Sequence, residues 1–84
     1  MYEVLLERRA EKDLRRLTAE IFRRAIAAIE ALAEDPRPEG CRKLTGSSND
    51  WRIRVGDYRV LYEIEDQNQV VRIMRVRHRR ESYR

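Results

Sequence analysis

The sequence predicts an α+β domain in which an N-terminal strand and an α-helical hairpin pack on a small antiparallel β-sheet. Two observations carry this prediction: apolar residues follow a helical period through the first half of the chain, and from residue 51 they alternate with polar residues. Helices followed by consecutive hairpins favour a sheet that is covered on one face. At 84 residues the chain has room for one small core, so we expect a single domain over residues 1–84.

The first half predicts a short strand and two helices. Residues 2–6 alternate as in a strand, and from residue 7 the period changes. Thr18 is expected to end a first helix and cap a second. The apolar positions fall in helical stripes at Ala10, Leu14, Leu17, Ile21, Phe22, Ala25, Ile26, Ala28, Ile29, Leu32 and Ala33. Pro36 and Gly40 end the second helix.

The second half predicts three strands at residues 51–55, 58–65 and 70–76, after a loop at residues 43–50. Gly56 and Asp57 form a two-residue turn candidate, with glycine first as a type II′ turn requires.

This turn fixes the pairing of the strands on either side of it. Val55 then lies opposite Tyr58, so Arg54 lies opposite Arg59 and Arg52 opposite Leu61. The three arginines share the face away from the core, and a bound phosphate would relieve the repulsion between Arg54 and Arg59. In the alternative interpretation they form an ordinary solvated surface.

The C-terminal segment adds more positive charge. Residues 42–84 hold eleven basic and six acidic side chains, a net charge of +5, and a basic half rich in arginine indicates a polyanionic partner such as nucleic acid. Six arginines of residues 71–84 join this cluster, with only Glu81 to oppose them: Arg72, Arg75, Arg77, Arg79, Arg80 and Arg84. His78 and Tyr83 lie among them as candidates for proton transfer or base stacking. The alternative places His78 at an ordinary surface and packs Tyr83 on the domain edge.

Several classes of protein are excluded by composition. The lone Cys41 permits no internal disulfide, and one cysteine with one histidine cannot form the usual four-ligand zinc site. The longest apolar stretch falls far short of the ~20 residues that span a bilayer. We therefore expect a cytoplasmic protein without a metal, a cofactor or a membrane partner.

Three segments together resemble the RelE branch of the RelE/ParE toxins of bacterial and archaeal toxin–antitoxin modules. They are residues 43–46 (KLTG), residues 51–62 (WRIRVGDYRVLY) and residues 76–83 (VRHRRESY). The resemblance covers nearly the whole chain and implies a metal-independent endoribonuclease that cuts mRNA in the ribosomal A site by attack of the ribose 2′-hydroxyl. It also implies a cognate antitoxin.

The resemblance further implies roles for single residues. Arg52 and Arg54 match two basic active-site positions, often lysine in the family, and Arg59 matches an arginine that holds the scissile phosphate. Arg79 matches an arginine near the end of the last strand, and Tyr83 a C-terminal tyrosine that stacks on a base or assists proton transfer.

His78 matches a histidine found in several relatives, which makes it a catalytic candidate with Arg59, Arg79 and Tyr83. Arginine stays protonated, so positions 52 and 54 cannot supply a neutral amine as general base. Two other functions stay open: a ParE-type toxin that inhibits DNA gyrase, and a non-catalytic module that binds RNA or an antitoxin.

Overall fold

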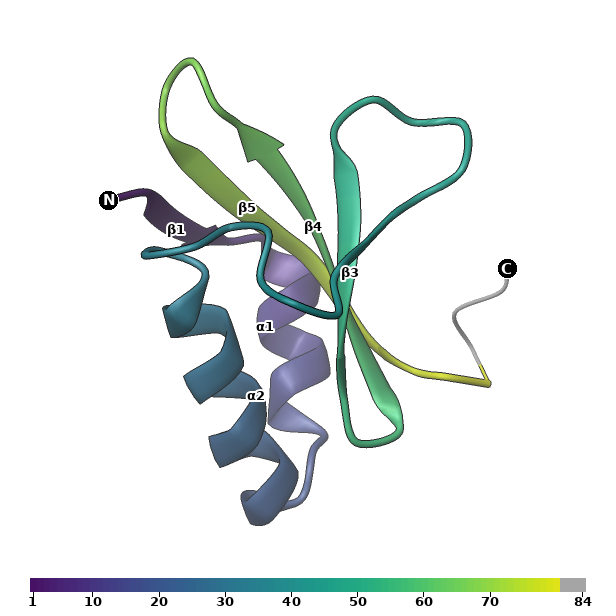
Figure 1. Ribbon diagram of the computed structural model, residues 1–84. Coiled ribbons are helices and arrows are strands. Elements are labelled where there is room, and N and C mark those ends of the chain that lie inside the picture. Colours follow the sequence, from purple (N-terminus) through teal and green to yellow (C-terminus); the bar gives the residue numbers. More distant parts are fainter. Residues whose placement is uncertain (81–84) are drawn as a thin grey trace.

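The structure, a computed structural model, describes residues 1–80 and has two layers, with both helices on one side of a five-stranded sheet (Figure 1). The helices are α1 (Arg8–Arg15) and α2 (Ala19–Ala31). The strands are β1 (Glu3–Leu6), β2 (Arg42–Lys43), β3 (Asp50–Val55), β4 (Tyr58–Glu65) and β5 (Val70–His78). The predicted α+β class and helical hairpin are confirmed.

The sheet is mixed, which corrects the expectation of a purely antiparallel one. Its strand order is β1-β5-β4-β3-β2, and β1 pairs parallel to β5 while the other neighbours are antiparallel. A parallel pair needs a crossover connection, and the two helices with the strands after them supply it. Alternation within residues 2–6 says nothing of the direction of the partner strand, so the sequence did not indicate this pairing.

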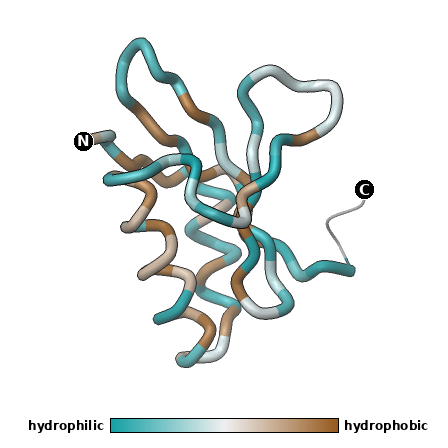
Figure 2. The backbone as a smooth tube through the Cα atoms, viewed as in Figure 1, coloured by the Kyte–Doolittle hydropathy of each residue, from teal (hydrophilic) through white to brown (hydrophobic). Residues whose placement is uncertain are grey.

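The core lies between the helices and the sheet. Apolar and polar positions intersperse along the helices and strands (Figure 2). The most deeply buried apolar side chains come from both layers: Ala10, Leu14, Ala25, Ile29, Leu32, Ile53, Val55, Val60, Tyr62, Ile64, Val71, Ile73 and Val76. Thr18 caps α2 as predicted, because its hydroxyl accepts from Ile21 N–H at 3.4 Å. Phe22, expected in the apolar stripe, is 40% exposed, so this part of the prediction is wrong.

The predicted pairing of β3 with β4 is confirmed. Arg54 lies opposite Arg59 and Arg52 opposite Leu61. Gly56 has a φ of +59°, the left-handed conformation that the first position of a type II′ turn demands.

Two features of the sheet were missed. The expected loop at residues 43–50 is flanked by the two-residue strand β2, which pairs with β3. Strand β5 runs to His78 instead of ending at residue 76, and its register against β4 shifts at Leu61/Tyr62, where Met74 is the extra residue. Such a bulge bends a strand and re-aims the side chains that follow it.

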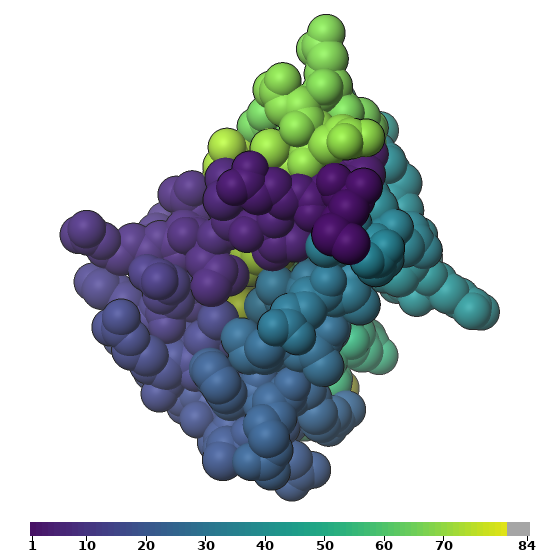
Figure 3. Space-filling model, turned by 90° about the vertical axis from the view of Figure 1, so that its left-hand side faces the viewer, coloured from purple at the N-terminus to yellow at the C-terminus, as the bar shows by residue number. Residues whose placement is uncertain are grey.

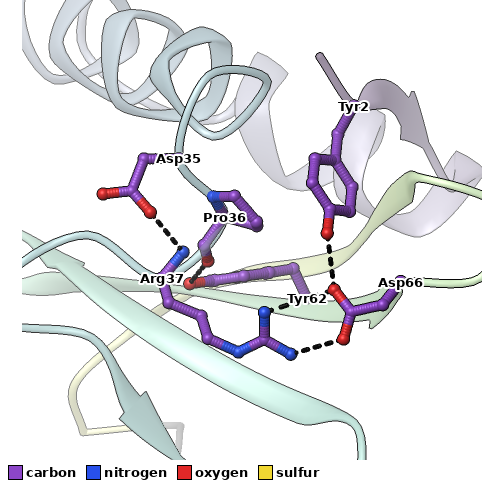
Figure 4. A network of polar contacts seen from close by, with 6 residues as sticks. All are labelled: Tyr2, Asp35, Pro36, Arg37, Tyr62 and Asp66. Atoms are coloured by element: carbon purple, nitrogen blue, oxygen red, sulfur yellow. Dashed lines mark hydrogen bonds and ion pairs between the residues drawn. The ribbon is translucent and has the colours of Figure 1, made fainter.

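A polar network fastens the segment after α2 to the sheet (Figure 4). Asp66 accepts from Tyr2 Oη at 2.6 Å and from both terminal nitrogens of Arg37, at 2.8 and 3.2 Å. The Arg37 guanidinium also lies 5.0 Å from the centre of the Trp51 ring. The Tyr62 hydroxyl is buried and donates a 2.8 Å hydrogen bond to the Pro36 carbonyl. Burial raises the pKa of Tyr62, so its hydroxyl stays a donor.

We expect Tyr62→Phe to lower the free energy of unfolding by about 1–2 kcal/mol, since it leaves the Pro36 carbonyl buried without its donor. Urea denaturation measures this change. Tyr2→Phe is the matched control: its hydroxyl bonds at an exposed site, where water replaces it, so the loss should be smaller. Equal losses in both variants would contradict the argument.

The side of the molecule with the helices is shown in Figure 3, where the turn between β4 and β5 projects beyond β1. No helix within residues 1–80 is both long enough and apolar enough to span a membrane.

Candidate functional site

Three strands bring one arginine each to the same level of the sheet. Arg59 in β4 lies opposite Arg54 in β3 on one side and opposite Arg77 in β5 on the other. Residues directly opposite share a face, and neighbouring strands lie ~4.8 Å apart, so three guanidinium groups gather on the face away from the helices. We call Arg54, Arg59 and Arg77 the arginine row.

Two members of the arginine row, Arg59 and Arg77, are more buried than a solvated surface would be, while Arg54 is exposed. Arg59 is only 5% exposed, although the sequence predicted an open position, and Arg77 is half-buried. Nε of Arg77 is buried and has no hydrogen-bond acceptor within residues 1–80. Placing these like charges side by side costs free energy, because Arg59 and Arg77 lose water and each guanidinium repels the next. An anion held by the row would offset this cost.

Two further arginines extend the face towards the sheet edge. Arg52 lies opposite Leu61 on one side and Arg42 on the other, so it is on the face of the arginine row, as predicted. Arg42 was missed as a candidate because β2 was taken for loop. In the sequence Arg42 stands out only as one more basic residue, directly before the KLTG segment.

The end of β5 places the remaining candidates. Arg79 is exposed and follows β5 directly; its N–H donates to the Asp57 carbonyl at 2.8 Å, which holds it beside the turn between β3 and β4. Arg80 is also exposed, and its N–H donates to Nδ1 of His78 at 3.2 Å. Tyr83 lies outside the described residues.

His78 is not brought to the arginine row. It lies opposite Tyr58, on the helix side of the sheet, and the two rings meet edge to face with their centres 5.2 Å apart. Because successive side chains of a strand point to opposite faces, Arg77 and His78 lie on the two sides of β5.

Two arginines that the sequence counted in the basic cluster belong to ion pairs. Arg72 lies 2.6 Å from Glu65 and 3.5 Å from both Glu7 and Glu63. Arg75 holds Asp13 of α1 with two hydrogen bonds, at 2.8 and 3.2 Å. Their carboxylate partners come from other elements of the chain, so a count of charges along residues 71–84 could not find them.

Asp13 is the residue that ties α1 to the bulge in β5. Besides Arg75, its carboxylate accepts from Val76 N–H at 2.9 Å. Burial alone would raise the pKa of Asp13, but the hydrogen bonds from Arg75 and Val76 outweigh it and hold the pKa below its ordinary value. Asp13 therefore stays ionised and fixes the part of β5 that leads to Arg77 and His78.

Within residues 1–80 no three side chains of the His, Cys, Asp and Glu types group closely enough to hold a metal ion. What the site offers chemically is positive charge: it can bind a phosphate and stabilise charge that develops on it.

Comparison of this chain with known proteins identifies the family to which it belongs. A model of the family described as "ParE toxin of type II toxin-antitoxin system, parDE" matches residues 4–83. Toxin RelG of Mycobacterium tuberculosis is 34% identical, over 99% of this chain and 97% of that protein.

Solved structures give the same result. The RelE chain of the archaeal RelE–RelB complex from Pyrococcus horikoshii OT3 superposes with a TM-score of 0.84 and 28% identity, over 96% of this chain and 98% of that one. The intact E. coli RelBE toxin–antitoxin complex gives a TM-score of 0.81 and 26% identity, over 93% and 96% of the two chains. The fold is thus that of a toxin of the type II toxin–antitoxin class. More narrowly, this chain belongs to the RelE/ParE toxin superfamily.

Proposed function

We propose that the protein is a ribosome-dependent endoribonuclease that cleaves mRNA in the ribosomal A site. The observation that carries the proposal is the arginine row, in which three cations from three strands are packed together on the open face of the sheet. This arrangement suits a single phosphodiester group, whose negative charge increases when it is attacked.

In the proposed reaction the ribose 2′-hydroxyl attacks the adjacent phosphate, and the bond to the 5′-oxygen of the next nucleotide breaks. The products are a 2′,3′-cyclic phosphate and a 5′-hydroxyl, so one proton leaves the 2′-oxygen and one reaches the 5′-oxygen. The arginine row, with Arg52 and Arg79, binds the phosphate and stabilises its extra charge. Arginine cannot accept the proton. Since His78 lies across the sheet from the row, the proposal gives proton transfer to Tyr83.

The proposed partners are the translating ribosome with its mRNA and a cognate antitoxin. Several of the similar solved structures are complexes of a RelE toxin with a RelB antitoxin, which supports an antitoxin for this chain. All these partners are cytoplasmic, so the proposed location is the cytoplasm.

Inducing the protein in a bacterial host and mapping mRNA ends by primer extension tests the proposal. We expect new 5′ ends within translated regions, in register with codons, that vanish when translation initiation is blocked. Cleavage that continues without translation, or no cleavage during growth arrest, would contradict it.

A ParE-type toxin that inhibits DNA gyrase is the second candidate, because the matching family model carries the ParE description. It predicts a DNA-damage response and intact mRNA after induction. A phosphate-binding arginine row is not needed for that activity, which is why we place it second.

Arg79→Ala and Tyr83→Ala are each expected to abolish growth arrest while the protein stays folded. Arg79 is exposed at the end of β5, so its removal takes charge from the site without opening the core. Loss of cleavage of about 10²-fold or more in translation extracts is the expected size of effect. Circular dichroism checks that each variant is folded. Full toxicity of both single variants would contradict the assignment of these residues to the active site.

A further inference from the structure

A hollow of about 440 Å³ lies on the helix side of the sheet, between the end of α1 and the end of β5. It is separate from the arginine row, because its lining includes the residues directly beside Arg59 and Arg77 in the strands, which point to the other face. Val76 and His78 of β5 line it, while Arg77 between them belongs to the row. The residues proposed above for phosphate binding, Arg52, Arg79 and the arginine row, do not line this hollow.

The hollow combines aromatic and apolar surface. Tyr58 and His78 contribute two rings fixed edge to face, and Leu17 and Val76 contribute aliphatic groups. Tyr58 and Leu17 also pack against the core, which limits their movement. A planar ligand can stack on such a surface, and base–aromatic stacking contributes about 1–3 kcal/mol.

The hollow also carries an excess of positive charge. Three arginines and one aspartate line it, and the aspartate is already engaged by one of the three in the Asp13–Arg75 pair. Arg16 at the end of α1 and Arg80 after β5 supply two further cations at exposed positions. Arginine forks bind phosphate through paired hydrogen bonds.

A ligand that is both planar and anionic meets both kinds of surface, and 440 Å³ falls in the range of small-ligand sites. We propose that this hollow is a nucleotide-binding subsite that takes one unpaired nucleotide of the RNA, next to the linkage held by the arginine row. The base stacks on the Tyr58–His78 wall and the phosphate pairs with Arg16 and Arg80. This inference rests on the proposed function, and it gives His78 a binding role.

The end of β5 joins the two sites. Strand β5 stops at His78, and Arg79 and Arg80 follow directly. RNA that is bound at the arginine row therefore reaches the helix side by passing around the end of β5. Arg79 and Arg80 lie along this path. A nucleotide that binds there would fix the register of the message on the enzyme.

Nuclear magnetic resonance on the full chain tests the subsite, with adenosine 5′-monophosphate as the probe. His78 is the only histidine, so its ring signals need no assignment by mutation. We expect saturable shifts of the His78 and Tyr58 ring signals, with weaker binding of adenosine and of ribose 5-phosphate, which each lack one half of the ligand. Arg16→Ala should weaken binding about tenfold, and His78→Ala by a similar factor.

Arg15→Ala is the matched control, because Arg15 is exposed on the same helix turn but does not line the hollow. It should bind the probe as the wild type does. No saturable shift, or equal effects of Arg15→Ala and Arg16→Ala, overturns the proposal. If inorganic phosphate binds as tightly as the probe, the hollow is a general anion site and the proposal is overturned. The proposal is also overturned if an acidic peptide shifts these signals and the nucleotide does not.

The binding test needs neither ribosome nor cleavage, so its failure is distinguishable from failure of the nuclease assignment. In translation extracts, Arg16→Ala should change the positions or the concentration dependence of mRNA cleavage more than its maximal rate. An unchanged cleavage map, at unchanged concentration dependence, would remove the link between the subsite and the reaction.

Discussion

Arg59→Met is expected to abolish mRNA cleavage and to leave the domain folded. Arg59 is the central member of the arginine row and is 5% exposed between Arg54 and Arg77. Loss of a charge that faces the phosphate in a site with little water should lower the cleavage rate by about 10²–10³-fold. This is the largest effect on activity that we expect from one substitution.

The fold should survive this substitution for a separate reason. Methionine keeps most of the aliphatic length of arginine, so it fills the same space between Arg54 and Arg77. Urea denaturation, measured alongside cleavage in a translation extract, checks that the variant is folded.

Arg72→Met is the matched control. Arg72 lies in the same sheet but is engaged by Glu7, Glu63 and Glu65, so its loss should leave cleavage unchanged and stability equal or slightly lower. Loss of cleavage in Arg59→Met beside full cleavage in Arg72→Met, with both variants folded, would show that Arg59 acts in the reaction. Active Arg59→Met protein, or a variant several kcal/mol less stable, would contradict the argument.

Local patterns predicted most of the fold and the pairing of two members of the arginine row. Alternation assigned the strand faces, and the glycine of a two-residue turn set the register that places Arg54 opposite Arg59. The hydroxyl of Thr18 marked the start of α2. Each of these signals lies within a few residues of the structure that it specifies.

The features that the sequence did not reveal depend on contacts between distant segments. The parallel pairing of β1, the bulge at Met74 and the pairing of Asp13 with Arg75 each join parts of the chain about sixty residues apart, or result from such contacts. His78 was grouped with the arginines because it is their neighbour in sequence. Extended backbone sends neighbours to opposite faces, and β5 extends further than its β-branched residues indicated.

Asp13→Ala is expected to cause a large loss of stability, about 2–4 kcal/mol. The carboxylate is 10% exposed and accepts from Arg75 and from Val76 N–H, so its removal leaves a partly buried guanidinium and a backbone donor without their acceptor. The pairing of β1 with β5 ends at Ile73. Beyond that residue, Asp13 holds β5 to α1 by accepting from Val76 N–H. Glu11→Ala, on an exposed position of the same helix, is the control and should change little.

Acid should narrow the difference in stability between the wild type and Asp13→Ala. Hydrogen bonds from Arg75 and Val76 hold the pKa of Asp13 below its unfolded value despite burial, so its stabilisation is complete above about pH 5 and is lost as the pH falls through the lowered pKa. Other carboxylates with lowered pKa values, Glu65 and Asp66, are present in both proteins and cancel in the comparison. Urea denaturation from pH 7 to pH 3 measures the difference. A gap that stays constant over this range would mean that Asp13 acts through packing, and that its ionised carboxylate is not what holds the end of β5.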